Sequence, residues 1–359
     1  MTTSQAQDPA QLVDERVPAV EGGSPAPGVR RRGAGGIASL LLQQYSLVLL
    51  LVLSILLYSV WSKTSGVFPT ADNARNILRS QAYLCIITLG LLVPLVADQI
   101  DLSVGNAAGL ASIACAASYS KYDAPLVVGV LIGVAAGTIC GVVNGLIISV
   151  FRIPPFVTTL GTASVYTGVV DWYSGGQSYS SNIPPSLVSF GGGSWAGIPR
   201  IMYLVAVVGL LAYYLLQHTP FGRSLHAIGS NRAAAELVGI RVQRSIFLSF
   251  VISGFAAGVG GVAIVANSGA GNPQIGPLIG LTAIAAVFLG AASFQLGRVN
   301  VPGTLVGVYF IAVNVTGLTF AGASNWINEL FTGLSLVLAI GLATFLSRKR
   351  LREGQVAVG

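Results

Sequence analysis

The chain alternates long apolar segments with short polar connections. Most apolar segments approach the roughly 20 residues that a helix needs to cross a hydrocarbon core of about 30 Å. Within them the apolar positions run on continuously, which favours helices over the alternating strands of a membrane β-barrel. The pattern therefore predicts ten transmembrane helices, over residues 37-61, 81-97, 102-120, 125-150, 157-172, 201-217, 246-266, 278-294, 302-320 and 327-346.

One pair of segments leaves two alternatives open. Only Asp98 to Asp101 separates 81-97 from 102-120, which is too short for an ordinary loop between spans. The stretch 81-120 is therefore either a tight hairpin or a broken helix that dips into the membrane and returns. Both ends lie on the same side in either case, so the sidedness of all later segments is unchanged.

The two ends of the chain differ from its middle. Residues 1-36 are rich in Gly, Pro, Ala and charge without apolar periodicity, so we expect a disordered cytoplasmic tail. No short apolar core with a cleavage site precedes residue 37, so we expect 37-61 to be an uncleaved anchor. The prediction is a membrane domain over 37-347, followed by a basic cytoplasmic tail over 348-359.

Composition agrees with a polytopic membrane protein. The chain is 53% hydrophobic and 9% charged, with a net charge of +7. Its basic residues are scattered between apolar segments and not clustered with aromatics, which argues against nucleic acid as a partner. If the N-terminus is inside, most of the 19 Lys and Arg residues are inside, as the positive-inside rule expects. Both termini are then cytoplasmic, and the outer set is Lys63, Arg75, Arg79, Lys121 and Arg200.

The long polar interval is 218-245, which the charge distribution places in the cytoplasm. Its four arginines face a single acid, Glu236. Ser230 or Asn231 is suited to cap a short helix over 232-238, with Gly239 just past its end. Such a helix is marginal alone, because nucleation is costly and few hydrogen bonds follow. We therefore interpret 218-245 as a docking element for another protein; the alternative is an ordinary solvated loop.

Small residues mark close helix packing. Glycines recur every fourth residue in 125-150, which suits a close crossing between two helices. Gly254 with Gly258 and Gly303 with Gly307 repeat the pattern. The cysteines Cys85, Cys115 and Cys140 have no metal-ligand spacing and are interpreted as small core residues. The glycine stripe comprises Gly129, Gly133, Gly137, Gly141 and Gly145.

A few polar residues fall at membrane depth. A carboxylate there is expensive and normally faces protein or water, so Asp101 either caps the helix that starts at Leu102, lines a solute pathway, or does both. Buried amides and hydroxyls likewise form inter-helix bonds or face the pathway. As candidate pathway residues we select Asp101, Ser103, Asn144, Phe156, Thr159 and Asn314.

Ordered strings over about 37 to 350 resemble the ribose-type permeases of bacterial ABC sugar importers. They include Ile100-Asp-Leu-Ser-Val-Gly105, Phe151-Arg-Ile-Pro-Pro-Phe156, Phe221-Gly222-Arg223 and Pro302-Gly-Thr304. The chain departs from the family pattern at Asp98-Gln99, where Gly-Gly is usual. It departs again at Arg232 and Ala233, where acids are common, and in the turn at 294-298.

The resemblance implies about ten helices, a homo- or heterodimer of permease subunits in the bacterial cytoplasmic membrane, an ATPase on the inside and a solute-binding protein outside. Monosaccharides and related polyols are the cargo it implies. ATP and Mg would be held by the ATPase, and this chain would carry no cofactor. The residues we expect to couple to the ATPase are Gly222, Arg223, Gly229, Asn231, Arg232, Glu236 and Gly239.

The chain lacks the G-x-x-x-x-G-K-[ST] string that cradles nucleotide phosphates, as well as H-E-x-x-H and G-x-S-x-G. We therefore do not expect it to be an enzyme by itself. One alternative function is a secondary transporter that uses Asp98 and Asp101 as a proton or sodium site. Another is a membrane scaffold without cargo.

Overall fold

The computed structural model describes residues 44-295, 297-324, 326-338 and 341, so both predicted tails lie outside the described residues. The regular secondary structure of the described residues is helical apart from one small hairpin. In order, its elements are α2 (Ser46–Val60), α3 (Ala71–Ser80), α4 (Ala82–Val96), α5 (Val104–Tyr122), α6 (Leu126–Ser149), α7 (Pro155–Ser174), α8 (Pro185–Gly192), β1 (Ser194–Trp195), β2 (Ile198–Pro199), α9 (Arg200–His218), α10 (Pro220–Ser230), α11 (Arg232–Leu237), α12 (Val242–Ser268), α13 (Ile275–Gly290) and α14 (Val301–Phe320). A further apolar helix covers Trp326–Leu338.

The predicted all-α membrane architecture is confirmed. Among the described residues, α6, α9, α12 and α14 are long and apolar enough to cross a bilayer, and α3 with α4 forms a fifth candidate bent by 41°. The helices α2, α13 and Trp326–Leu338 are apolar but shorter. Within the described residues, each of the ten predicted segments overlaps one helix. The count of ten spans and the cytoplasmic position of both termini stay predictions.

The stretch 81-120 is preceded by a helix that was not predicted, α3, which meets α4 in a bend at Gln81, where the predicted segment starts. The stretch itself is interrupted by the non-helical segment 97-103 between α4 and α5, which we call the break. Pro94 lies in the last turn of α4, and its carbonyl accepts hydrogen bonds from the backbone N–H groups of Ala97 and Gln99. The chain thus leaves the helix in a tight turn.

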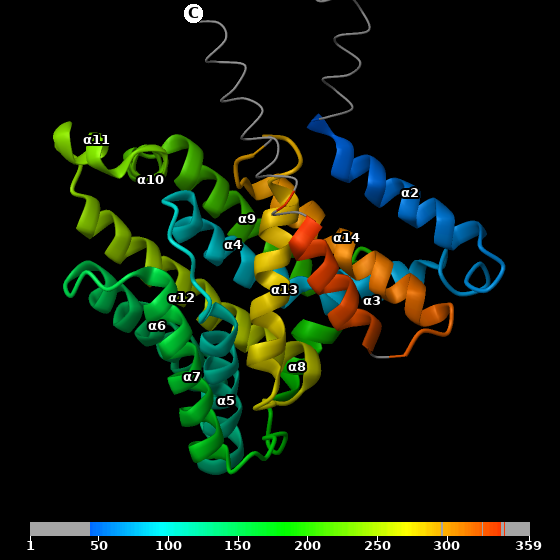
Figure 1. Cartoon of the computed structure of the whole chain (residues 1–359). Helices are drawn as coiled ribbons and strands as arrows, with labels where there is room; N and C mark the ends of the chain where they lie inside the picture. The colour runs from blue at the N-terminus through cyan, green and yellow to red at the C-terminus, as the bar shows by residue number, and fades with distance from the viewer. Residues whose placement is uncertain (1–43, 296, 325, 339–340, 342–359) are drawn as a thin grey trace, which may run out of the picture. The chain divides into compact units, whose positions relative to one another are not determined.

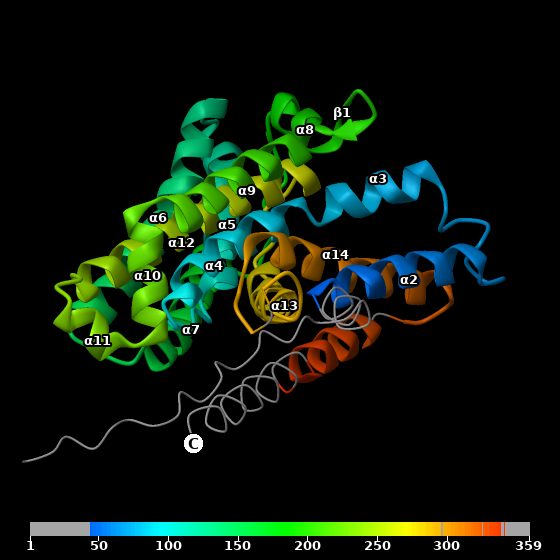
Figure 2. The ribbon, with the colours of Figure 1, turned by 90° about the horizontal axis from the view of Figure 1, so that it is seen from above.

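Helix α12 lies at the centre of the core, packed against α4, α5 and α6 (Figure 1). The glycine stripe on α6 allows the closest of these contacts. Gly137 lies against Gly258 and Gly141 against Gly254, with no side chain between the two backbones. The three cysteines are buried and unpaired, as expected of core residues. On the other side of the core α2 runs along α14 (Figure 2).

Candidate functional site

The predicted docking element contains a helix that sequence reasoning missed. Helix α10 begins with Pro220 at its first position, where a missing N–H costs nothing, and Thr219 accepts a hydrogen bond from Gly222 N at 3.1 Å. Its buried side chains are those of Leu225 and Ile228, three residues apart on one face. The signal was present as a Thr-Pro start followed by this apolar spacing.

The second helix of the element, α11, was predicted. Asn231 caps it, because its side-chain oxygen accepts a hydrogen bond from Ala234 N at 3.0 Å. The helix ends at Leu237, one residue earlier than expected. Gly239 follows with φ of 83°, a left-handed conformation in which a side chain would be strained. The local geometry expected of Asn231 and Gly239 is therefore present.

Two glycines let α10 approach its neighbours at backbone distance. A Cβ on Gly222 would overlap the carbonyl oxygen of Leu216 at the end of α9. A Cβ on Gly229 would overlap the carbonyl oxygen of Val96 and lie 3.3 Å from Ala97 Cα. Helix α10 therefore rests directly on the end of α4, where the break begins.

The opposite side of the element is exposed. Arg223 is exposed on α10, and on α11 Arg232 Nε lies 3.7 Å from Glu236 Oε1 in an exposed ion pair. Leu237 is 89% exposed and Val238 76% exposed. Two apolar side chains beside a charged pair form a small surface suited to contact with another protein.

A polar pocket of about 330 Å³ lies between α10, the break and the turn before α14. Asp98, His226, Ser230 and Arg298 line it. Burial and the nearby positive charge of Arg298 lower the pKa of His226 below its usual value of 6.5. Both effects favour the neutral form of the imidazole. Asp98 is exposed here.

Asp101 is buried in the break and held by hydroxyl groups. Its side chain is only 4% exposed. Oδ1 accepts hydrogen bonds from Ser103 N at 3.0 Å and Ser103 Oγ at 2.7 Å, and Oδ2 accepts one from Ser253 Oγ of α12 at 3.1 Å. Asp101 has no ion-pair partner in the part of the chain that the structure describes. It is not the cap residue of α5, which begins at Val104.

The hydrogen bonds continue from Asp101 into neighbouring helices. Asn144 Nδ2 of α6 donates to Ser103 Oγ at 2.7 Å, and Tyr166 Oη of α7 donates to Asn144 Oδ1 at 3.2 Å. From another position on α7, Thr159 Oγ1 accepts from Leu102 N at 3.1 Å. Side chains of three helices, α6, α7 and α12, thus form hydrogen bonds with the break.

Three of the six candidate pathway residues, Asp101, Ser103 and Asn144, therefore belong to one buried network, with Ser253 and Tyr166 as members that sequence reasoning missed. Thr159 binds the backbone of the break instead. In this conformation the polar atoms of these residues are bound within the protein, so contact with a solute stays a prediction. Phe156 lies apart, 54% exposed at the start of α7. Asn314 also lies apart on α14, where its Oδ1 accepts a hydrogen bond from Tyr58 Oη at 3.4 Å. No spacing in the sequence links Ser253 or Tyr166 to Asp101.

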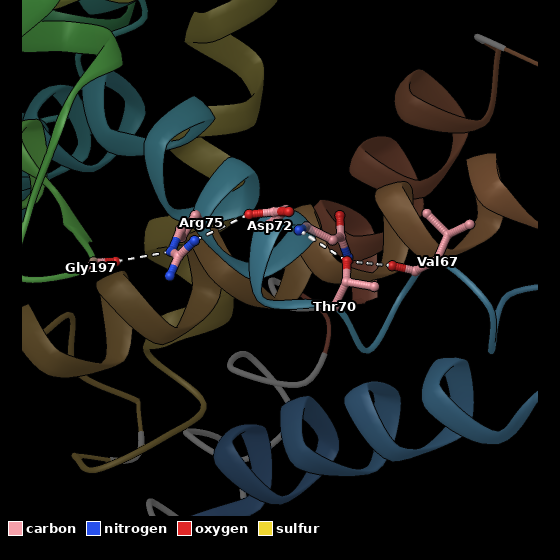
Figure 3. A network of polar contacts seen from close by, with 6 residues as sticks. Val67, Thr70, Asp72, Arg75 and Gly197 are labelled. Carbon is pink, nitrogen blue, oxygen red and sulfur yellow. Dashed lines mark hydrogen bonds and ion pairs between the residues drawn. The ribbon is translucent and has the colours of Figure 1, made fainter.

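On the predicted outer side, α3 presents a polar face to the hairpin before α9 (Figure 3). Arg75 Nε donates to Gly197 O at 3.2 Å, and Arg75 Nη1 pairs with Asp72 Oδ1 at 3.1 Å. One turn on, Arg79 Nη1 donates to Gly192 O at 3.3 Å. Both arginines line a polar pocket of about 250 Å³.

Comparison with known proteins identifies relatives across most of the chain. Residues 73–340 match the family described as branched-chain amino acid transport system / permease component. The chain is 30% identical over 318 residues to the ribose import permease protein of Haemophilus influenzae, covering 88% of this chain and 97% of the relative. It is 33% identical over 261 residues to the autoinducer 2 import system permease protein of Klebsiella pneumoniae, covering 73% and 75%. No solved structure matches it.

The family model spans well over half of the chain, and the ribose permease relative is covered almost end to end. The apolar helices fit the same assignment. The chain therefore belongs to the family of branched-chain amino acid transport system / permease components, and is a multi-pass membrane permease of an ABC importer.

Proposed function

We propose that the chain is the membrane-spanning subunit of an importer that moves a monosaccharide or related polyol into the cell, driven by a separate ATPase docked on 218-245. The relatives' names support the class of cargo, since they include import permeases for ribose and for autoinducer 2. ATP and Mg bind to that ATPase. A solute-binding protein delivers cargo outside, and a second permease subunit completes the membrane unit.

The observation that carries this proposal is the construction of the docking element. An ordinary solvated loop is expected to be irregular, but 218-245 contains two helices, α10 and α11, each with a side-chain N-cap. Buried contacts hold α10 to α9 and α4, while Leu237 at the end of α11 and the following Val238 are exposed to solvent. Exposed apolar side chains in water are unfavourable unless a partner covers them. The ATPase is that partner in our proposal.

Charge reversal on α11 is expected to uncouple ATP hydrolysis from uptake. Arg232→Glu or Glu236→Arg reverses a charge that faces the ATPase, and like charges across an interface repel. We expect ATP-driven uptake to fall about tenfold in either variant. Uptake and ATP hydrolysis are measured together in proteoliposomes containing the whole complex.

The double variant Arg232→Glu/Glu236→Arg distinguishes an effect on docking from an effect on the stability of α11. It restores the ion pair within α11 but leaves both charges reversed toward the partner. An exposed pair of this kind contributes only about 0.3–0.5 kcal/mol to the helix. The docking role predicts that the double variant is as impaired as the single variants. Recovery in the double variant, or normal uptake in both single variants, would show that these charges do not dock.

The outer arginines are suited to receive the solute-binding protein. Arg75 and Arg79 lie four residues apart on one face of α3, and each donates a hydrogen bond to a backbone carbonyl; Figure 3 shows the contact of Arg75 with Gly197. A guanidinium group has five N–H donors, so donors are left for a carboxylate of a partner.

Arg79→Glu is expected to weaken delivery of the cargo. The half-maximal concentration of binding protein should rise about tenfold, and more at low ionic strength, because charge pairing at the rim of an interface is screened by salt. The matched control is Lys63→Glu, the same change of charge at another exposed outer position. Equal effects of the two variants would indicate a general influence of charge and no docking at Arg79.

Isolation of the complex tests the proposed composition. The protein is extracted from its native membrane under mild conditions, and co-purifying proteins are identified. We expect an ATPase of the ABC class, and in the presence of cargo a solute-binding protein. Purification of the chain with no ATPase, before and after chemical cross-linking, would favour the scaffold or the secondary transporter.

A further inference from the structure

We propose that Asp101 is a positioning residue that ties the break at 97-103 to α12, so that the break moves together with the docking element 218-245. This inference rests on the proposed function and adds the route by which motion at the ATPase reaches the membrane interior. Ser253 is the residue of α12 that binds Asp101. Asp101 acts by holding the break in position, and this role requires no contact with the cargo.

The first step is the position of the break between two parts of the same unit. At its start, the carbonyl of Val96 lies directly under Gly229 of α10. Near its end, Asp101 binds Ser253 of α12. Helix α11 lies between α10 and α12 in the chain, and Ile240 N donates to Ala235 O at 3.1 Å in the turn that leads into α12. A displacement of the docking element is therefore applied to both ends of the break.

The second step is the strength of the tie. The steric contact between α10 and α4 transmits motion only when α10 moves toward α4. An attractive interaction such as a hydrogen bond is needed for the break to follow an element that moves away from it. Asp101 is buried and its side chain accepts three hydrogen bonds, and a hydrogen bond in a low-dielectric interior is stronger than the same bond in water. Loss of the Ser253 bond leaves Oδ2 unpaired in a buried site, which is costly.

The third step is the choice of Ser253 over other buried hydroxyls of α12. Ser249 is also fully buried, one turn earlier on the same helix. Its Oγ donates to Ile246 O within α12, at 2.7 Å. Ser253 Oγ instead donates to Asp101 Oδ2 in the break between α4 and α5. The two serines are therefore chemically matched, and the contact with the break distinguishes them.

The test compares Ser253→Ala, Ser249→Ala, Asp101→Ala and Asp101→Asn in the reconstituted complex. Cargo transported per ATP hydrolysed should fall about tenfold for Ser253→Ala and at least as much for Asp101→Ala. Ser249→Ala should equal the wild type. Asp101→Asn should be close to the wild type, because its amide oxygen can accept from Ser103 and its amide nitrogen can donate to Ser253.

Hydrogen exchange over residues 97-104 provides a readout that does not depend on transport. Ser253→Ala should speed exchange in this segment relative to Ser249→Ala, while exchange in α6 stays unchanged as a check on folding. Equal exchange in the two serine variants, or equal transport per ATP, overturns the proposal. So does a loss in Asp101→Asn with none in Ser253→Ala, since charge and not the tie would then matter. Absence of ATP-driven uptake in the wild type would instead refute the proposed function.

Discussion

Replacing Gly141 by valine is expected to destabilise the membrane domain more than any other single change considered for this chain. A Cβ at this position overlaps the carbonyl oxygen of Phe250 and lies 2.8 Å from Gly254 Cα. These neighbours are backbone atoms of α12, which cannot move aside as a side chain can. Overpacking a core typically costs about 1–3 kcal/mol, and backbone overlap places this substitution at the upper end of that range.

Gly161→Val is the matched control. Gly161 also lies within a helix, on the exposed side of α7, and a Cβ there meets no atom within 4 Å. Both variants change helix propensity alike, so the difference between them reports the packing of α6 on α12. Thermal unfolding in detergent measures it. If Gly141→Val and Gly161→Val unfold at the same temperature, the close crossing of α6 and α12 is incorrect.

Replacing Gly229 by alanine is expected to abolish most ATP-driven uptake while the chain still folds. The added methyl group would overlap the carbonyl oxygen of Val96 and push α10 away from the end of α4. The docking element would then transmit less of its motion to the break. We expect uptake to fall roughly tenfold or more, as a strain of about 1–3 kcal/mol in the coupled state implies.

Ser224→Ala on the same helix adds no atom and is the control for α10. Ser224 Oγ donates only to Pro220 O within α10, so its removal leaves the contact with α4 intact. Uptake and the binding of the ATPase are measured for both variants. Unimpaired uptake in Gly229→Ala would mean that α10 does not act through the end of α4.

Much of the fold was predictable because the bilayer imposes a simple rule on sequence. The ten apolar segments overlap helices wherever the structure describes them. The glycine stripe on α6 indicated a close crossing, and its partner helix α12 carries Gly254 and Gly258, which were also singled out. Helix α3 was missed, since it is polar on one face and falls outside any long apolar segment. Helix α10 was missed because its apolar positions are few and the interval as a whole is basic.

The candidate site was predictable residue by residue but not as an arrangement. Asp101, Ser103, Asn144 and Thr159 were selected separately as polar residues at membrane depth, and the structure brings them together. Ser253 was not selected, because one serine among several on α12 looks the same in sequence. Only the packing of α12 against the break distinguishes it from Ser249. Which serine of α12 faces the break depends on how two distant segments pack, and nothing in the sequence around either serine indicates it.

The most direct test of the central claim is uptake of radiolabelled ribose and a panel of related sugars and polyols into proteoliposomes containing the chain, its co-purified ATPase and the binding protein. We expect uptake of at least one of these solutes that requires ATP and Mg inside the reconstituted system, stops with vanadate and survives the collapse of proton and sodium gradients. Uptake that ignores vanadate and disappears with an ion gradient would contradict the claim and assign the chain to ion-coupled transport.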